Sequence, residues 1–461
     1  MINLTHGIVT DTHVLYYSPT DTGMRFVQQP IDTAVLTSIG SYIDIANQYQ
    51  LSQLWILPGT NVSATFATYD DTFVTSSLDA YRVFPTELAS YMEGRHKNRP
   101  GTEVSLLTPA YIDGLPGSVT HMGDAKSLYA YVTYLQTVLG ITFVRDAKGT
   151  GIELLRSVNT RGQRSDFLRG PTSDMTPFYE HKSIDLQWSR ALTDDEKRLQ
   201  HVHVIDRNYM YLAGTSGLHV GAGDYQYQRS NGSRDIQFNK KQPGIWHVTV
   251  VGTPDTSTLQ VPYVLPRHTD MWLDTALVQV AIDAGYWLRI NEAYTFPDSH
   301  MVFNPWYTVL RDALTALTTD AMYKNETART AAIDTIKMLY RQTIGLIGRQ
   351  PETGENHKWY SRPDAFNAVV AESKKRMHIT IQQLHNANVR IVGCYVDALY
   401  VVSDKELDQL LPDQVVISQQ IGKYKHAGTY PVRDVADMFT DNPQTMVKGL
   451  AHYKRETLQN G

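Results

Sequence analysis

Residues 389–406 read VRIVGCYVDALYVVSDKE, and this stretch constrains the fold more than any other part of the chain. Apolar residues on both sides of Asp397 predict two strands that pair as a hairpin. An unpaired charge in an apolar interior costs several kcal/mol, so such acids usually hold a metal ion or lie at a functional edge. We therefore expect Asp397 to be a buried acid with a functional role.

Length and composition narrow the class of protein. A chain of 461 residues is long for one hydrophobic core, which predicts two or three subdomains. The formal net charge of -5 argues against a protein that coats nucleic acid nonspecifically, yet it allows a local basic groove. Cys394 is the only cysteine, so no internal disulfide or cysteine-type zinc site can form. With no signal-peptide pattern and no long apolar run, we expect a cytoplasmic protein without a membrane partner.

The first third of the chain has the pattern of an α/β domain. Strand patterns cover residues 7–19, 23–30 and 51–59, and helical spacing covers residues 32–50 and 124–140. Residues 161–185 are polar and rich in turn-forming residues, which predicts a linker.

The rest of the chain mixes strands with long helices. RLQHVHVIDRNYMYLAG begins as a strand and breaks into a glycine-containing turn, and GIWHVTVVG and QVPYVLPR continue as sheet. Helical patterns follow over residues 304–322, 325–349 and 362–388. The hairpin around Asp397 comes next, and QQIGKYKHAG predicts a last strand.

Two single acids and a basic helix suggest chemistry. Asp206 and Asp397 each lie on an apolar strand, and the helical pattern between them carries Lys337 and Arg341, four residues apart and so on one face. Nucleotidyl transfer needs acids that hold a divalent metal ion, and cations that bind the triphosphate. An ordinary α/β domain with two edge acids and a solvated basic helix face has the same spacing, so spacing alone leaves both interpretations open.

Three short motifs resemble, in order, those of the family B DNA polymerases, above all the small protein-primed phage type. DRNYMYL resembles the first motif, Asp, two residues, then Ser-Leu-Tyr-Pro, and keeps Asp206 and Tyr211. KMLYRQTIG resembles the second and keeps Lys337, with Arg341 where the family has Asn. YVDALY resembles the third, Tyr-x-Asp-Thr-Asp-Ser, and IGKYKHAGTY resembles the primer-contacting strand that follows it. The order and gaps agree over roughly residues 195–430.

The departures from the family pattern bear on catalysis. The resemblance implies that the metal is held by Asp206 and by the second acid of the third motif, and that position is Leu399. Leucine cannot ligate a hard cation, and Asp404 lies more than about 20 Å further along a strand. Asp397 then looks like the remaining half of a lost pair. A shifted hairpin register, as in the Tyr-x-Asp-Asp hairpin of reverse transcriptases, would instead leave Asp206 and Asp397 as a two-acid site for Mg²⁺ or Mn²⁺.

The resemblance also implies a domain order. Residues 1–160 would form a ribonuclease H-like domain with a degenerate exonuclease site, in which DTH at Asp11 replaces Asp-x-Glu. After the linker at 161–185, residues 186–310 would form the first part of the palm and 311–365 the fingers helices. Residues 366–430 would complete the palm, and 431–461 would form a reduced thumb. The expected fold class is α/β (α+β).

The leading hypothesis is a DNA-binding family B polymerase-like pseudoenzyme that acts in replication or maintenance of a mobile element or of DNA ends. Its partners would be primer-template or single-stranded DNA and a replication protein. The alternatives are an active metal-dependent DNA polymerase that uses Asp206 and Asp397, and a scaffold that binds only protein. The expected nucleotide or DNA contacts are Lys337, Arg341, Tyr211, Tyr395, Lys423 and Lys425.

Overall fold

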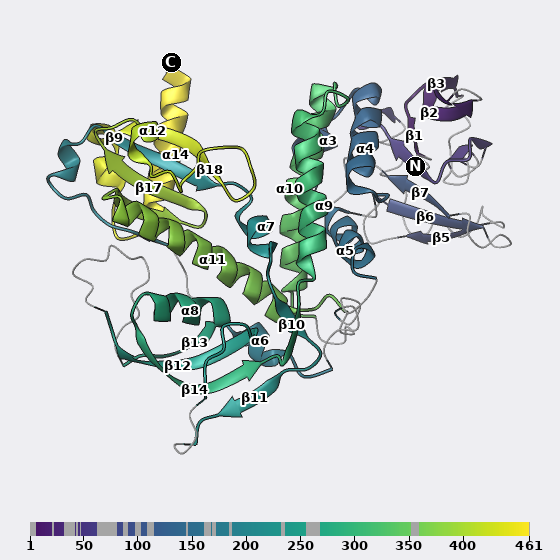
Figure 1. Cartoon of the computed structure of the whole chain (residues 1–461). Coiled ribbons are helices and arrows are strands. Elements are labelled where there is room, and N and C mark those ends of the chain that lie inside the picture. The colour runs from purple at the N-terminus through teal and green to yellow at the C-terminus, as the bar shows by residue number, and fades with distance from the viewer. Residues whose placement is uncertain are drawn as a thin grey trace. The chain divides into compact units, whose positions relative to one another are not determined.

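The computed structural model describes residues 6–20, 23–31, 42, 45–46, 48–61, 81–85, 91–96, 103–107, 115–143, 146–160, 167, 172–183, 187–231, 236–254, 268–351 and 359–460. The fold mixes helices with several sheets, which confirms the expected α/β class (Figure 1). The chain forms two compact units. Unit 1 comprises Met1–Val158 and Thr308–Ile344, and unit 2 comprises Asn159–Tyr307 and Gly345–Gly461. No helix among the described residues is long and apolar enough to cross a membrane.

Unit 1 contains a seven-stranded mixed sheet. Strand β1 runs parallel to β4, and β4 runs parallel to β7, whereas the other neighbours are antiparallel. In spatial order the strands are β3 (Gly23–Pro30), β2 (His13–Thr20), β1 (His6–Val9), β4 (Gln53–Ile56), β7 (Glu103–Leu107), β6 (Tyr91–His96) and β5 (Tyr81–Pro85).

The first predicted strand of unit 1 is in fact a hairpin. The pattern over residues 7–19 reads as one strand, but β1 and β2 pair with each other. The His13 N–H donates to the Thr10 hydroxyl at 2.9 Å and thereby closes a tight turn. Asp11, the expected remnant of a nuclease motif, lies in this turn.

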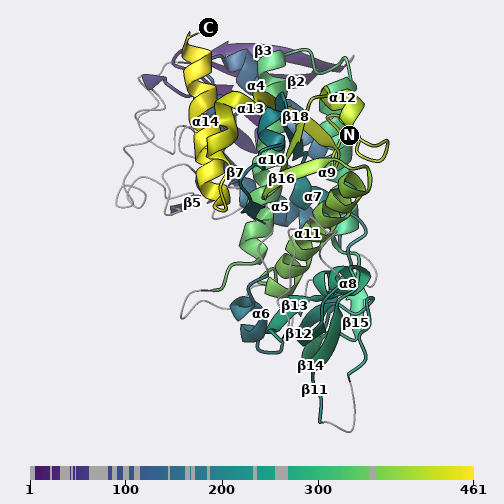
Figure 2. The same cartoon turned by 90° about the vertical axis from the view of Figure 1, so that its left-hand side faces the viewer.

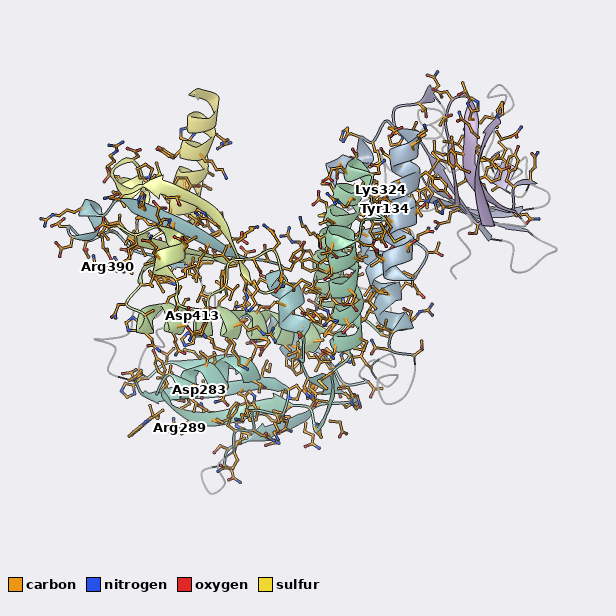
Figure 3. The ribbon with its side chains drawn as sticks, turned by 45° about the horizontal axis from the view of Figure 1, so that its top comes forward. Tyr134, Asp283, Arg289, Lys324, Arg390 and Asp413 are labelled. Atoms are coloured by element: carbon orange, nitrogen blue, oxygen red, sulfur yellow. The ribbon has the colours of Figure 1, made fainter. Side chains whose placement is uncertain are left out.

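The helices of unit 1 follow the predicted spacing. Helix α4 (Ala125–Leu139) begins at Asp124, whose carboxylate caps its first turn, and ends at Gly140 with a φ of 69°. Helices α3 (Gly117–Thr120) and α5 (Ala147–Ser157) flank it. Helix α10 (Glu326–Ile347) lies beside α4, where the Asn325 N–H donates to the Tyr134 hydroxyl at 3.2 Å (Figures 1 and 3). Most of the predicted helix over residues 32–50 lies outside the described residues.

Unit 2 contains a four-stranded antiparallel sheet with helices on both faces. Helix α8 (Thr275–Asp283) packs on the inner face, where Trp246, Val248 and Leu277 are buried. Helix α6 (Thr176–Glu180) packs on the outer face through Phe178. In spatial order the strands are β11 (Gln226–Arg229), β14 (Trp287–Thr295), β12 (Gly244–Gly252) and β13 (Asp270–Asp274). Strands β10 (Val220–Ala222) and β15 (Asp298–His300) form a separate pair. The predicted strand QVPYVLPR lies outside the described residues.

A second sheet of unit 2 carries the predicted acids. In spatial order its strands are β18 (Tyr424–Pro431), β9 (His201–Arg207), β17 (Ala398–Ser403), β16 (Arg390–Tyr395) and β8 (Trp188–Ser189). Helix α11 (Pro363–Asn386) packs on one face, and α13 (Val432–Val435) and α14 (Pro443–Asn460) pack on the other (Figure 2). Burial on both faces explains the continuous apolar runs of these strands. The hairpin predicted over residues 389–406 is confirmed as β16 and β17.

The remaining helices lie in segments that the sequence assigns to a linker, to parts of the palm and fingers, and to a thumb. Residues 161–185 include α6, and residues 431–461 include α13 and α14, whose Val432, Val435, Met446 and Leu450 are buried against the sheet. Helix α9 (Phe303–Thr319) confirms the predicted helix over residues 304–322 and runs from unit 2 into unit 1. The assignment of these segments to linker, palm, fingers and thumb stays a prediction.

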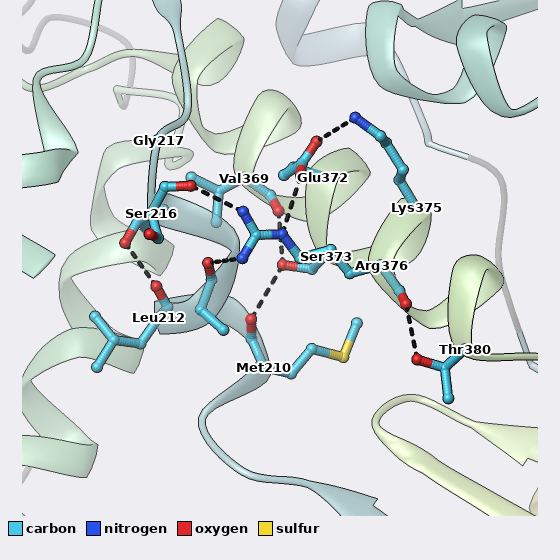
Figure 4. A network of polar contacts seen from close by, with 12 residues as sticks. Met210, Leu212, Ser216, Gly217, Val369, Glu372, Ser373, Lys375, Arg376 and Thr380 are labelled. Carbon is cyan, nitrogen blue, oxygen red and sulfur yellow. Dashed lines mark hydrogen bonds and ion pairs between the residues drawn. The ribbon is translucent and has the colours of Figure 1, made fainter. Parts of the chain in front are cut away.

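A network of hydrogen bonds fixes the segment that follows β9. The expected glycine-containing turn is a short helix, α7 (Met210–Thr215), with Gly214 inside it. The Arg376 guanidinium on α11 donates to the carbonyl oxygens of Ala213 at 2.5 Å and Ser216 at 2.8 Å, and also to the Glu372 carboxylate at 3.0 Å (Figure 4). These bonds hold the last carbonyl groups of α7 against α11.

The contact between α7 and α11 leaves no space for a side chain at position 214. A methyl group there would lie 2.2 Å from the Ser373 Oγ and 3.1 Å from the Val369 carbonyl oxygen. We expect Gly214→Ala to lower the free energy of unfolding by about 1–3 kcal/mol in urea titrations. As a control, Gly345→Ala on α10 meets no atom within 4 Å and should be neutral or stabilising. If Gly214→Ala and the wild type have the same free energy of unfolding, position 214 has room for a methyl group and α7 does not pack closely on α11 there.

Candidate functional site

Asp206 lies near the end of β9, between two neighbouring strands. It pairs with Ala398 on β17 and with Lys425 on β18. The Lys425 Nζ lies 3.2 Å from the Asp206 Oδ1, and the side chains of Lys425 and Asp206 are 44% and 23% exposed. The acid that stands alone in the sequence therefore has a cation as its partner, supplied by a strand more than 200 residues later.

Asp397 lies in the turn of the hairpin rather than within a strand. Tyr395 pairs with Ala398, so Val396 and Asp397 form a two-residue turn, in which Val396 has a φ of 54°. The Arg207 N–H donates to the Asp397 carbonyl oxygen at 2.8 Å, which places this turn beside the end of β9. The expectation of a buried acid is wrong, because Asp397 is only partly buried where the chain reverses.

Leu399 is buried on the opposite face of the sheet from Asp206. It pairs with Ile205 and is 0% exposed, in the core that α11 covers. Successive residues of a strand point to opposite faces, so Asp206 shares its face with Ala398 instead. The side chain that faces Asp206 across the β9–β17 pair is thus a methyl group, and no carboxylate lies at position 398 or 399.

Two tyrosines share the face of Asp206. Tyr395 is partly buried against the core under α13 and α14, and Tyr400 is 6% exposed in that core. Burial raises the pKa of the Tyr400 phenol, and the carboxylates of Asp397 and Asp206 add to this shift. Tyr400 therefore stays neutral, and the partly exposed Tyr395 is the aromatic group nearest the surface at the hairpin turn.

The loop before β18 is fastened to the end of β9. The Asn208 N–H donates to the Lys423 carbonyl oxygen, and the Gly422 N–H donates to the Asn208 carbonyl oxygen, both at 2.8 Å. Lys423 lies in the bend directly before β18, and Lys425 is the second residue of this strand. Tyr211, partly buried, is the second residue of α7. The structure therefore brings Asp206, Asp397, Lys423 and Lys425 to one end of this sheet.

Lys337 and Arg341 lie on α10 in unit 1, whereas Asp206 and Asp397 belong to unit 2. The helical spacing that puts the two cations on one face is confirmed. The Lys337 Nζ lies 3.1 Å from the Asp334 Oδ1, one turn earlier on the same helix. Their participation in one site with the two acids stays a prediction.

The residues at this end of the sheet do not by themselves form a metal site. In the part of the chain that the structure describes, no group of three or more His, Cys, Asp or Glu side chains is placed to hold a metal ion. Mg²⁺ can bind through two carboxylates when substrate phosphates and water supply the other ligands. Here the Lys425 ammonium already neutralises the Asp206 carboxylate. A metal ion would have to compete with that cation.

The solved structures that match this chain include DNA polymerases. No protein-family model and no curated protein matches the sequence. A structure of Phi29 DNA polymerase complexed with primer-template DNA aligns with 92% of this chain and 84% of its own, at 13% identity and a TM-score of 0.47. The same enzyme complexed with single-stranded DNA gives the same coverage, 12% identity and a TM-score of 0.48. The family B DNA polymerase of the archaeon Pyrobaculum calidifontis aligns with 98% of this chain and 62% of its own, at 9% identity and a TM-score of 0.34.

Sequence reasoning missed the pairing of Asp206 with Lys425 and the place of Arg207. Lys425 is expected only as a DNA contact, because its partner on β9 is set by a pairing between strands far apart in the sequence. The Arg207 guanidinium lies over the Tyr424 ring, 5.6 Å from the centroid, and burial lowers the pKa of Arg207. No local pattern indicates this contact, because the two residues meet only when β18 pairs with β9.

Removal of the Lys425 charge should make Asp206 available to a metal ion. We expect Lys425→Met to raise the affinity for Mn²⁺, measured by electron paramagnetic resonance of free Mn²⁺, by about fivefold or more, because a neighbouring cation no longer repels it. Lys448→Met, which removes an exposed lysine on α14, should leave the affinity unchanged. The gain should vanish in the Lys425→Met variant that also carries Asp206→Asn. An unchanged Mn²⁺ affinity in Lys425→Met would contradict the competition.

Proposed function

We propose that this chain is a DNA-binding protein with a family B polymerase-like core that no longer polymerises. The observation that carries the proposal is the ion pair between Lys425 and Asp206, at 3.2 Å. A lysine at this place supplies the positive charge that a divalent metal ion would otherwise supply to Asp206. The motif resemblance supports the family, and the residues around Asp206 support the loss of synthesis.

Binding of DNA is supported by the cations beside the hairpin turn. Lys423 lies in the bend directly before β18, Lys425 is the second residue of this strand, and the partly exposed Tyr395 lies on the same side of the sheet as Lys425. Lysines that neutralise phosphates give most of the affinity for nucleic acid, and tyrosine rings stack on bases. Lys337, Arg341 and Tyr211 are proposed as further contacts with a primer-template or a single strand.

Loss of synthesis is supported by the side chains around Asp206. Leu399 is fully buried on the opposite face, and Ala398 faces Asp206 across the strand pair. Neither offers an oxygen to a hard cation. The site therefore has one acid on the strand, paired with Lys425, and one in the turn.

A role in replication or maintenance of a mobile element or of DNA ends follows from the resemblance to protein-primed polymerases. A replication protein partner, a ribonuclease H-like first domain and a cytoplasmic location are part of the same proposal.

One observation favours a second candidate, an active metal-dependent DNA polymerase. The hydrogen bond from the Arg207 N–H to the Asp397 carbonyl oxygen brings the turn of Asp397 beside Asp206, so the two carboxylates belong to one end of the sheet. Substrate phosphates could then complete the coordination of Mg²⁺ or Mn²⁺. In that case Asp206→Ala would abolish synthesis but leave DNA affinity unchanged or higher, because it removes a negative charge from the DNA surface.

The salt dependence of DNA binding tests the proposed function. We expect the full chain to bind a short DNA hairpin with an affinity that falls steeply between about 50 and about 200 mM salt. Lys423→Ala with Lys425→Ala should weaken binding and reduce the slope of log affinity against log salt by about 2, one for each lost phosphate contact. The matched control, Lys448→Ala with Lys454→Ala on α14, makes the same change in net charge away from the site. Weak binding that does not depend on salt would instead favour a protein-binding scaffold.

A further inference from the structure

A cavity of 630 Å³ lies in unit 2, and none of the acids and lysines of the candidate site lines it. Its walls come from α11, the start of α8, the start of β12 and the segment after α7. The volume falls in the range of small-molecule sites, about 300–1,000 Å³. Figure 4 shows three of the lining residues on α11: Arg376 reaches the end of α7, and Lys375 points to Glu372.

The acids of the cavity are already paired within the protein. Asp364 accepts two hydrogen bonds from Arg362, at 2.8 and 2.7 Å, and both side chains are almost fully buried. The Glu372 carboxylate accepts from Arg376 at 3.0 Å and from Lys375 at 3.2 Å. A third acid, Asp274, lies 3.0 Å from the His181 Nε2. Asp364 and Glu372 are thus paired with cations, and Asp274 is hydrogen-bonded to an imidazole.

The cations at the mouth are not neutralised in this way. Lys240 and Lys241 are exposed residues of one turn, and among the described residues no acid lies within ion-pair distance of either. Lys375 shares the Glu372 carboxylate with Arg376, so its charge is only partly compensated. The mouth therefore carries an excess of positive charge, which favours an anionic ligand.

Helix α8 adds to this positive field, because it begins in the wall of the cavity. Thr275 and Ala276, its first residues, line the space. The preceding Asp274 makes no side-chain capping bond, since its carboxylate is held by His181. The positive end of the helix dipole therefore points to the same region as the lysines.

Part of the cavity lining is apolar. Pro243 and Ala368 contribute partly exposed side chains, whereas Phe178, Phe296 and Ile245 also belong to the lining but are each 2% exposed or less. A ligand with a flat apolar part and a phosphate would place the apolar part against this lining and the phosphate near the lysines.

We propose that this cavity binds a nucleotide, with its base against the apolar wall and its phosphate at Lys240, Lys241 and Lys375. The site is separate from the end of the sheet that carries Asp206, and binding needs neither DNA nor a metal ion. It does not depend on the proposed function.

Titration of the full chain with dAMP in the presence of EDTA and without DNA tests this site by calorimetry. We expect saturable binding of dAMP, and weaker binding of adenosine and of inorganic phosphate, which each lack half of the contacts. Lys240→Ala with Lys241→Ala should weaken dAMP binding by about tenfold or more. Ala368→Phe, which fills the cavity without a change of charge, should abolish it.

The controls separate this site from the DNA site. Lys448→Ala with Lys454→Ala, and separately Asp206→Ala, should leave dAMP affinity as in wild type. Binding that is equal in wild type, the lysine pair variant and Ala368→Phe would overturn the proposal, as would no saturable binding of dAMP. Inorganic phosphate that binds as tightly as dAMP would also overturn it, because the apolar wall would then have no role. If Ala368→Phe does not fold, the variant with Lys240→Ala and Lys241→Ala still tests the proposal.

Discussion

The ion pair between Lys425 and Asp206 determines the charge of the carboxylate at this end of the sheet, and with it the proposed chemistry there. It links β18 to β9 through side chains that are partly exposed, so it contributes only about 0–1 kcal/mol to stability. Its consequence is electrostatic: the carboxylate of Asp206 is neutralised by the protein itself. Lys423, in the bend directly before β18, adds a second cation near this end of the sheet.

The rest of the sheet determines which groups can reach that pair. The register of β9 with β17 places Ala398 beside Asp206 and turns Leu399 into the core under α11. Helices α13 and α14 cover the other face along Val202 and Val204, so only the end of β9 is partly open. Arg376 holds α7 against α11 and thereby fixes the chain directly after Asp206. The open end of the sheet therefore carries Asp206 with Lys425, and positions 398 and 399 add no carboxylate.

Local patterns predicted much of this fold, because apolar spacing reports helices and strands directly. The helices α4, α9, α10 and α11 and the hairpin of β16 and β17 follow from it. Which face a residue takes, and which strand it meets, depends on register and on turns. A two-residue turn therefore placed Asp397 at the surface rather than inside a strand, and a distant strand gave Asp206 its partner. The motif order pointed to Asp206, Asp397 and Leu399, but only the pairing of strands showed that Lys425 completes the group.

Primer extension on a short DNA hairpin tests the central claim most directly. The assay would use Mg²⁺ and then Mn²⁺, with wild type, Asp206→Ala and Asp397→Ala, at a salt concentration where wild type binds the hairpin. We expect the hairpin to be bound and not to be extended with either metal ion. Extension by wild type that both substitutions abolish would contradict it, and would show that Asp206 and Asp397 hold a metal ion despite Lys425.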